Sequence, residues 1–478
     1  MSTVQPTILA GRLSRSSGNL LRYALSYAPR ALVPKEAGYA RALAEMRESE
    51  FWPAERLRDL ADARLRRLVA YAVDHVPYYR ELFARERLDP REIQGVGDLP
   101  KIPVLTRETL RERFEDLKSD EFDKHAPYLG QSGGSTGERR RFWLSRRSMD
   151  VEFAAVRRHY DSVGYRDGDR CAALYFPLEG SLAGRLYWDD WKSRMRCLNT
   201  RLLNRHYFHE LIGAAVAFGA DVLWTYPSHL ELLLHYIEET GDDRLRPRVI
   251  LTNAEVLYEH QREHARRVLG CDVFDWYGLG EHVAAAAECE QHGYHIPEEI
   301  VAVEILSGGK EAADGQPGEI IGTCFENYAQ PLIRYRTGDY AVRRHDRCPC
   351  GRAHAMLREI GGRTQDIIST PEGGWRAFRH GLFGTELVPG LKAVQLEQLE
   401  IRRFVARAVA PCGLDAEARQ VLARRVVEAI GFEASVEVEL VHDIPRTERG
   451  KRRMVISRVP MTMLDPPATR NDSRDGVA

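Results

Sequence analysis

A glycine- and hydroxyl-rich stretch, GQSGGSTGERRR, occupies residues 130–141. Glycines let several backbone N–H groups turn toward one point, hydroxyls add hydrogen-bond donors, and the arginines that follow add positive charge. Such a loop is suited to holding phosphate oxygens. It is not a Walker loop, because no Lys-Ser or Lys-Thr pair follows the last glycine. A flexible surface linker of similar composition is the alternative on this stretch alone. The residues predicted to hold phosphate are Ser132, Gly133, Gly134, Ser135, Thr136 and Gly137.

Two carboxylates and one lysine lie in glycine-containing turns farther along the chain. YGLGE (277–281) places Glu281 just past a predicted strand, where it can hold Mg²⁺ beside a phosphate. PLIRYRTGD (331–339) is predicted to end a strand at Asp339, which can accept both hydroxyls of a ribose. PRTERGK (445–451) puts Lys451 on a loop, from which its ammonium can reach a reacting carboxylate. Taken singly, the carboxylates equally fit ordinary turns, and the lysine fits a solvated surface.

Three cysteines and a histidine form a candidate metal site. Cys348 and Cys350 flank a proline and make a tight knuckle, and Cys289 and His295 on a second segment complete four ligands. This set suits tetrahedral zinc, and a structural role is expected because the protein fills all four positions. Two free thiols are the alternative for the knuckle. The rival histidine ligands are His292, His345 and His354.

Other polar and aromatic residues give weaker signals. Among the 16 histidines, only His282 is a candidate general base, because it neighbours Glu281. Aromatic residues that follow predicted strands could line a pocket for an acid substrate, although ordinary core packing explains them equally well. These pocket candidates are Tyr175, Phe176 and Tyr226.

The elements that must position these residues alternate between strand and helix after the glycine loop. Short apolar runs bounded by helical stretches such as 258–269 predict a parallel α/β sheet covered on both faces. The chain then becomes strand-rich, and helices are predicted before the loop, at 54–76 and from Thr106 to about Leu117. The predicted strands are 171–176, 221–224, 248–251, 273–276, 300–306, 318–325 and 331–342.

A change in composition at Gly361-Gly362-Arg363 predicts a domain boundary. Beyond it, strands at 394–399 and 436–440 and a helix at 415–430 predict a small α+β module. The predicted units are an N-terminal arm at 1–52, a large α/β domain at 53–363, a small domain at 364–459 and a disordered tail at 460–478.

Composition narrows the function classes. The 478 residues include 69 Lys and Arg against 70 Asp and Glu, so the charge favours neither nucleic acid nor an acidic membrane. No run of 18 apolar residues exists to span a membrane. Eight scattered cysteines without a secretory signal predict reduced thiols and a cytoplasmic location. The first 35 residues are basic and contain no acidic residue. A transit peptide or a membrane-surface helix has this composition, and so does an N-terminal arm, which is the preferred interpretation.

In this order and spacing, the motifs resemble the adenylate-forming superfamily of acyl-CoA synthetases, and more closely its phenylacetate–CoA ligase-like and capsule-biosynthesis-like branch. The resemblance covers about residues 65–457. It rests on SGGSTGE, YGLGE, PLIRYRTGD, CPCGR with GGRTQD, and PRTERGK. The fold that it implies is a large N-terminal α/β domain followed by a small mobile α+β domain.

The resemblance implies a role for each matching residue. The 132–137 loop would grip the phosphates of ATP, Glu281 would bind Mg²⁺, Asp339 and Arg363 would contact the ribose, and Lys451 would steady the carboxylate and the α-phosphate. Related ligases carry a similar set of zinc ligands. The residues implied around the adenine and in the adjoining turn are Asn253, Ala254, Glu255, Asp275, Trp276, Tyr277, Gly278 and Gly280.

The implied reaction is ATP-dependent activation of a carboxylic acid, aromatic or small cyclic by the habit of the branch, and transfer of the acyl group to a thiol, by default CoA. Three departures qualify it: Gly280 replaces a hydroxyl residue, Gln365 replaces the hinge aspartate, and residues 370–375 replace a longer glycine loop. Transfer to an amine or to a carrier-protein thiol therefore stays open, as does a non-catalytic nucleotide-binding protein. A homodimer is compatible with the sequence.

Overall fold

The structure, a computed structural model, covers most of the chain between residues 37 and 459. The basic segment 1–35, the tail predicted to be disordered, Arg363 and Lys451 lie outside the described residues. No helix within the described part is long and apolar enough to cross a membrane. The described residues are 37–133, 139–166, 168–175, 185–191, 193–200, 205–255, 257, 259–313, 315–361, 367–371, 375–377, 388, 391, 393–410, 413–444 and 455–459.

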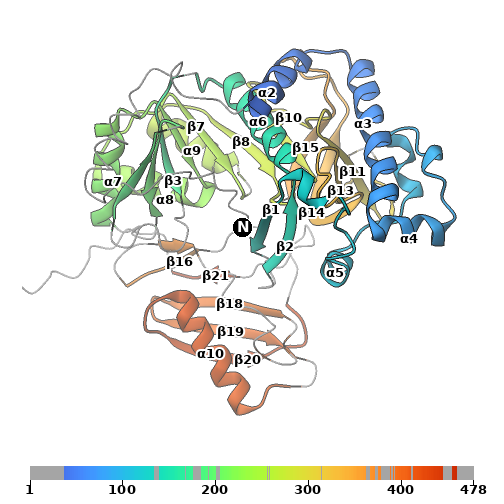
Figure 1. The fold of residues 1–478 in the computed structure, drawn as a ribbon. Helices are drawn as coiled ribbons and strands as arrows, with labels where there is room; N and C mark the ends of the chain where they lie inside the picture. The colour runs from blue at the N-terminus through green and yellow to red at the C-terminus, as the bar shows by residue number, and fades with distance from the viewer. Residues whose placement is uncertain are drawn as a thin grey trace, which may run out of the picture.

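A 13-stranded sheet organises the large part of the molecule (Figure 1). Its strand order is β12-β11-β13-β14-β15-β10-β9-β8-β7-β6-β3-β5-β4. Five neighbouring strands pair in parallel, which confirms the α/β class predicted from the apolar runs. These five are β3 (Cys171–Tyr175), β5 (Met195–Asn199), β6 (Val222–Thr225), β7 (Val249–Asn253) and β8 (Val273–Gly278).

Alternate residues of these strands supply two separate cores, because side chains point to opposite faces of a sheet. Leu223 and Ile250 join the core formed with α7 (Arg205–Phe218), α8 (Pro227–Thr240) and α9 (Glu259–Leu269). Val222 and Leu251 pack on the other face with Val163 and Tyr165, which follow helix α6 (Arg146–Ser162). Both faces of the parallel strands are therefore covered, as predicted.

The rest of the large sheet is antiparallel. Strand β14 begins at Tyr335, so residues 331–334 are not strand, contrary to the prediction. The strands of this half are β9 (Ala285–Glu288), β10 (Tyr294–His295), β11 (Val301–Ser307), β12 (Lys310–Glu311), β13 (Pro317–Cys324), β14 (Tyr335–Arg344) and β15 (Met356–Gly361). At the opposite edge, β4 (Tyr187–Asp190) pairs antiparallel with β5.

Helices that precede the glycine loop cover the antiparallel half. Helix α3 (Ala54–His75) stops before Pro77 as predicted, and Pro77 then begins α4 (Pro77–Glu86), where a proline at the first position costs no hydrogen bond. Helix α5 (Arg107–Glu112) is shorter than predicted. Helix α2 (Ala37–Ser49), inside the stretch predicted as an arm, buries Ala42 and Met46 in a core shared with α6. Three 3₁₀ helices lie at Pro90–Glu92, Val96–Lys101 and Phe122–His125.

Two hairpins and a second sheet complete the described elements. The first hairpin is β1 (Tyr128–Gly133) with β2 (Arg139–Leu144), and the second is β16 (Ile367–Ser369) with β17 (Trp375–Ala377). The second sheet has the order β20-β19-β18-β21 and lies apart from the large sheet in Figure 1. It consists of β18 (Ala393–Glu400), β19 (Arg403–Val409), β20 (Ser435–Leu440) and β21 (Val455–Ser457), with helix α10 (Ala416–Ile430) packed on it.

Candidate active site and metal cluster

The glycine-rich loop connects the two strands of the first hairpin. Strands β1 and β2 pair in register from Tyr128 opposite Leu144 to Gly133 opposite Arg139. Residues 134–138, which include most of the predicted phosphate contacts, lie outside the described residues, as does the side chain of Ser132. The hairpin nonetheless fixes where the two ends of the loop leave the fold.

The residues expected around the adenine lie at the ends of two adjacent parallel strands. Asn253 ends β7 and pairs in register with Trp276 of β8. Ala254 has φ of +67°, so the chain turns sharply as it leaves β7, and Glu255 beside it is buried. Ligands of open α/β sheets bind outside the carboxyl ends of the strands, which is where these residues lie.

Asp275 is fixed inside the fold. Its carboxylate accepts hydrogen bonds from Thr252 Oγ1 at 2.7 Å and from Tyr294 Oη at 3.1 Å. Burial raises the pKa of Asp275 to about 7, and the hydrogen bond from Thr252 opposes this rise. Beneath it, Glu288 accepts from the Asp275 backbone N–H at 2.7 Å and pairs with Arg262 at 2.9 Å. This buried network holds the end of β8 in place.

A bulge in the antiparallel half positions Asp339. Glu319 of β13 pairs with Tyr340 and Ile321 pairs with Arg336, so three residues of β14 lie opposite one residue of β13. Gly338 has φ of +75°, and Thr337 donates through Oγ1 to the Ile320 carbonyl at 2.8 Å. Asp339 therefore lies in the middle of β14, not at a strand end as predicted. Bulges of this kind redirect a side chain next to a site.

The YGLGE and TGD motifs meet at one hydrogen bond. Tyr277 donates from its hydroxyl to Asp339 Oδ2 at 3.1 Å, although 62 residues separate them. Burial raises the pKa of Tyr277 well above its ordinary value, and the charges of Asp339 and Glu281 raise it further. Asp339 and Glu281 are themselves buried. Two carboxylates thus lie near one phenol, as expected if Glu281 and Asp339 serve the same nucleotide site.

The candidate general base and one of the candidate substrate-pocket residues are buried, and the side chains of the other pocket candidates lie outside the described residues. His282, the candidate base, is buried, and burial lowers its pKa to about 4, so it is a neutral imidazole at pH 7. Tyr226 precedes α8 and packs against His229 with ring centroids 5.2 Å apart. Tyr175 ends β3, but its side chain lies outside the described residues, as does Phe176.

Cys289, His295, Cys348 and Cys350 come together as predicted. Their ligand atoms all lie within 4.8 Å of one another. The Sγ atoms of Cys289 and Cys348 are 3.6 Å apart, and two sulfurs bound tetrahedrally to zinc at 2.3 Å would be roughly 3.8 Å apart. Cys350 Sγ lies 3.3 Å from His295 Nε2. A Cβ on Gly293 would lie 3.2 Å from Cys348 Sγ, so a glycine there leaves room for the ligands.

The chemistry of the four donors fits a structural zinc ion. Burial, with smaller effects from His354 and Arg352, lowers the pKa of His295 to about 3, which keeps it in the neutral form that binds metals. The rival ligands are engaged elsewhere or lie outside the cluster. His292 contacts Glu288 at 2.8 Å and stacks on Phe274, and His354 contacts Glu299.

A buried charge network surrounds the cluster. Glu299 is 1% exposed and pairs with Arg158 Nη1 at 2.5 Å and His354 Nε2 at 3.1 Å, and it accepts from Ser49 Oγ at 2.5 Å. Burial opposes ionisation of Glu299, but Arg158 and His354 outweigh it and hold its pKa well below the ordinary value. Arg352, next to the knuckle, also pairs with Glu50 at 2.6 Å. The knuckle is thereby fastened to the end of helix α2.

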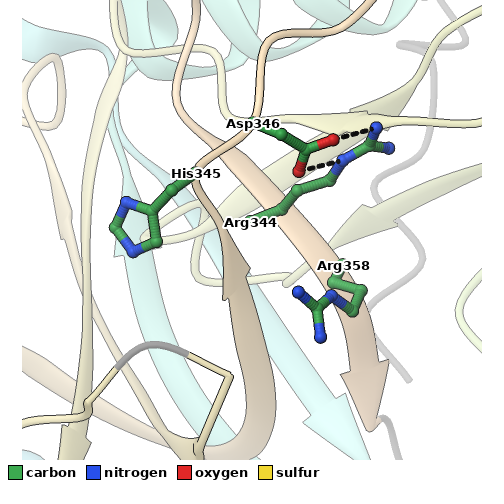
Figure 2. A pocket seen from close by; sticks show the side chains of 4 residues that line it. All are labelled: Arg344, His345, Asp346 and Arg358. Atoms are coloured by element: carbon green, nitrogen blue, oxygen red, sulfur yellow. Dashed lines mark hydrogen bonds and ion pairs between the residues drawn. The ribbon is translucent and has the colours of Figure 1, made fainter.

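A surface cavity of about 560 Å³ lies at the end of β14 and is lined by Arg344, His345, Asp346 and Arg358 (Figure 2). Arg344 is paired there with Asp346 through two hydrogen bonds, at 2.8 and 2.7 Å. None of the residues predicted to bind nucleotide lines this cavity, and we assign it no role in the site.

One buried group near the end of β8, Glu152, was not predicted from the sequence. Glu152 of helix α6 is 7% exposed, and its Oε1 lies 3.5 Å from the point that a Cβ on Gly278 would occupy. The sequence could have indicated its burial, because this carboxylate lies between Val151 and Ala154, which both belong to the core that α6 packs against. Helical periodicity alone did not distinguish it from the other charged residues of α6.

Known proteins resemble this chain in sequence and in fold. No family model matches the chain. A phenylacetate–coenzyme A ligase of Thermus thermophilus is 27% identical over 345 residues, which cover 67% of this chain and 73% of that protein. The Pseudomonas putida phenylacetate–coenzyme A ligase is 28% identical over 315 residues, covering 64% and 70%.

Among solved structures, 2-hydroxyisobutyryl-CoA ligase in complex with 2-HIB-AMP and CoA has a TM-score of 0.62 at 18% identity, covering 90% of this chain and 95% of that one. An open conformation of that ligase has a TM-score of 0.55. These structures support the fold: a large sheet domain and a small C-terminal sheet. The chain is a distant homologue of the phenylacetate–CoA ligases, and these sequence relatives are acid–CoA ligases of the adenylate-forming type.

Proposed function

We propose that this protein uses Mg·ATP to activate a small carboxylic acid as an acyl-adenylate and then transfers the acyl group to CoA. The observation that carries the proposal is the hydrogen bond from Tyr277 to Asp339, with Glu281 beside the same phenol. It brings a predicted ribose ligand and a predicted magnesium ligand to the carboxyl end of the parallel strands. The homology to acid–CoA ligases supports the same reaction.

In the proposed first step, a carboxylate oxygen of the acid attacks the α-phosphorus of ATP, and pyrophosphate leaves. The glycine loop at 132–137 would hold the phosphates through backbone N–H groups, and Asp339 would accept from the ribose hydroxyls. Glu281 would hold Mg²⁺, whose charge would offset the charge that develops on the phosphoryl oxygens. Lys451 would place its ammonium against the reacting carboxylate and the α-phosphate. Arg363 would contact the ribose, and residues 253–255 and 275–278 would enclose the adenine.

In the second step, a thiolate displaces AMP from the acyl-adenylate and forms a thioester. CoA is the acceptor named for the related ligases. The alternatives are an amine or a carrier-protein thiol. They are motivated by residues 370–375, which replace the longer glycine loop of many CoA ligases.

The four-ligand cluster belongs to the proposal as a structural zinc site. Cys289, His295, Cys348 and Cys350 leave no open position at a tetrahedral ion, so the ion would hold the turn after β9 to the knuckle before β15 and take no part in the reaction. The hydrogen bonds and ion pairs around Glu299 would hold the segments that carry the ligands in place, without any of these groups binding the ion.

Pyrophosphate release tests the proposal. The purified protein is incubated with ATP, Mg²⁺ and a panel of aryl and alkyl acids, with and without CoA. We expect acid-dependent pyrophosphate release, acyl-CoA formation when CoA is present, and a loss of roughly 10²–10³-fold in Lys451→Ala. Lys310→Ala, at an exposed strand end, should keep full activity.

Three outcomes would count against parts of this scheme. Unchanged pyrophosphate release in Lys451→Ala would remove the lysine from the mechanism. AMP release without acyl-CoA would favour an amine or carrier-protein acceptor. No acid-dependent release with any member of the panel, together with a melting temperature that ATP and Mg²⁺ do not shift, would leave the protein without the proposed activity.

A further inference from the structure

The segment that leads into helix α5 is fastened to the start of strand β14. The backbone of Leu105 donates to the Arg334 carbonyl and accepts from the Arg336 N–H, both at 2.9 Å, as in a parallel β-bridge. Thr106 then caps the helix through its side-chain oxygen. These contacts hold the backbone of Arg107, the first residue of α5, against β14.

The guanidinium of Arg107 packs directly on the backbone of Gly338. A Cβ at Gly338 would lie 2.9 Å from Arg107 Cζ and 3.1 Å from Arg107 Nη1, so only a glycine admits the guanidinium this close. Gly338 is followed by Asp339, whose carboxylate accepts from the Tyr277 hydroxyl at 3.1 Å. A cation is thus held beside the residue that is proposed to bind the ribose.

The same segment also contacts the hairpin that carries the glycine loop. Two residues after α5, the ring of Phe114 lies 5.1 Å from the guanidinium carbon of Arg141 on β2. The side chain of Gln330 donates to the Phe114 carbonyl at 3.1 Å and accepts from the Trp143 N–H on β2 at 2.8 Å. Residues 105–114 therefore connect this hairpin to β14, and α5 lies beside the hairpin in Figure 1.

This placement indicates which part of a nucleotide Arg107 would meet. In the proposed function, the ribose lies at Asp339 and the phosphates extend toward the glycine loop. The α-phosphate is bonded to the ribose through its 5′ oxygen, so it is the phosphate nearest Asp339. Asp339 and Glu281 are buried carboxylates that would repel a phosphate, and a cation beside them offsets this repulsion. A guanidinium also matches two phosphate oxygens with two parallel N–H groups.

We propose that Arg107 binds the α-phosphate of the nucleotide. This inference rests on the proposed function, because it adds a phosphate-binding residue to the same site. The α-phosphate is common to ATP and the acyl-adenylate, so the contact would persist through both half-reactions. It would come from a helix that no motif of the sequence marks as part of the nucleotide site.

The test compares ligands that differ in their phosphates. Adenosine, AMP and ATP with Mg²⁺ are titrated calorimetrically into the wild type and the variants. We expect Arg107→Gln to weaken the binding of AMP by about 10–100-fold, since a hydrogen bond between charged groups is lost, and to leave adenosine binding within roughly threefold. Arg107→Lys keeps the charge but not the two parallel N–H groups, so its AMP affinity should be intermediate.

A matched control is Arg111→Gln, one turn farther along α5, where the side chain is 58% exposed and lies 3.8 Å from Glu112. It should bind all three ligands as the wild type does. An equal loss of adenosine and AMP binding in Arg107→Gln would mean that Arg107 only supports the turn at Gly338, and would overturn the inference. Unchanged AMP binding with weaker ATP binding would place Arg107 at the outer phosphates and would overturn it as well.

Pyrophosphate release, measured on the same proteins, separates failure of this inference from failure of the proposed function. A loss of AMP binding that is specific to the Arg107 variants supports the inference even if no acid releases pyrophosphate. Acid-dependent release together with AMP binding that the Arg107 variants do not change refutes the inference and leaves the proposed function standing. A wild type that binds neither AMP nor ATP refutes both.

Discussion

Removing the carboxylate of Glu299 should destabilise the protein more than any surface ion-pair change. Glu299 is 1% exposed, and its carboxylate serves Arg158, His354 and Ser49. In Glu299→Ala, the buried Arg158 guanidinium would lose its counter-charge, a change that costs about 3–5 kcal/mol. Glu299→Gln keeps the volume and one acceptor oxygen, so about 1.5–3 kcal/mol is expected. The control is Glu290→Gln, at the half-exposed partner of Arg352, with less than about 1 kcal/mol.

The pH dependence of this loss has a definite sign. Since the pKa of Glu299 is lower in the folded protein than in the unfolded chain, its contribution is complete above the ordinary glutamate pKa and decreases on acidification below it. Urea unfolding at pH 7 and pH 4, followed by tryptophan fluorescence, measures both effects. The difference in unfolding free energy between wild type and Glu299→Gln should shrink at pH 4. A difference below 1 kcal/mol at pH 7, or one that grows at pH 4, would refute the reasoning.

Three further predictions concern the metal cluster and the two carboxylates. Cys348→Ser should lower bound zinc from about one equivalent toward zero by atomic absorption, whereas Cys271→Ser, outside the cluster, should retain it. Asp339→Asn should raise the KM for ATP about 10–100-fold in the pyrophosphate assay and leave the KM for the acid nearly unchanged; equal changes in both would argue against a ribose contact. Between pH 5 and 8, the wild type should lose stability relative to Glu152→Gln by up to about 1.4 kcal/mol per pH unit in urea unfolding, because only the folded state keeps the proton until about pH 8; parallel profiles would contradict this pKa.

Local patterns were sufficient to predict four of the five parallel strands of the large sheet, whereas β5 was not predicted. The runs at 222–225, 249–253 and 273–278 are short, apolar and separated by helices, and a strand buried on both faces has this signature. The end of α9 was also predictable, because a glycine follows its last residue. Gly270 adopts φ of +68°, and its N–H donates to the Arg266 carbonyl. The metal cluster followed from the chemistry and spacing of its cysteines.

Non-local pairing explains what the sequence did not predict. The mid-strand position of Asp339 depends on how β14 aligns with β13, because the bulge opposite Ile320 exists only in that register. That the two halves form one sheet depends on β9 pairing with both β8 and β10. Glu152 could not be identified as buried and unpaired before α6 was placed against Gly278. The domain boundary near 363 and the roles of Arg363 and Lys451 stay predictions.

The continuity of the 13-stranded sheet has a consequence for the reaction cycle. Tyr277 belongs to β8 and Asp339 to β14, and unbroken backbone hydrogen bonding through β9, β10 and β15 joins these two strands. The proposed contacts to adenine and sugar would therefore be preformed on one continuous sheet, and their two sides would not move against each other. In the proposed cycle, any rearrangement between the two half-reactions would fall to segments outside this sheet, so an acid could be exchanged while the nucleoside end stays anchored.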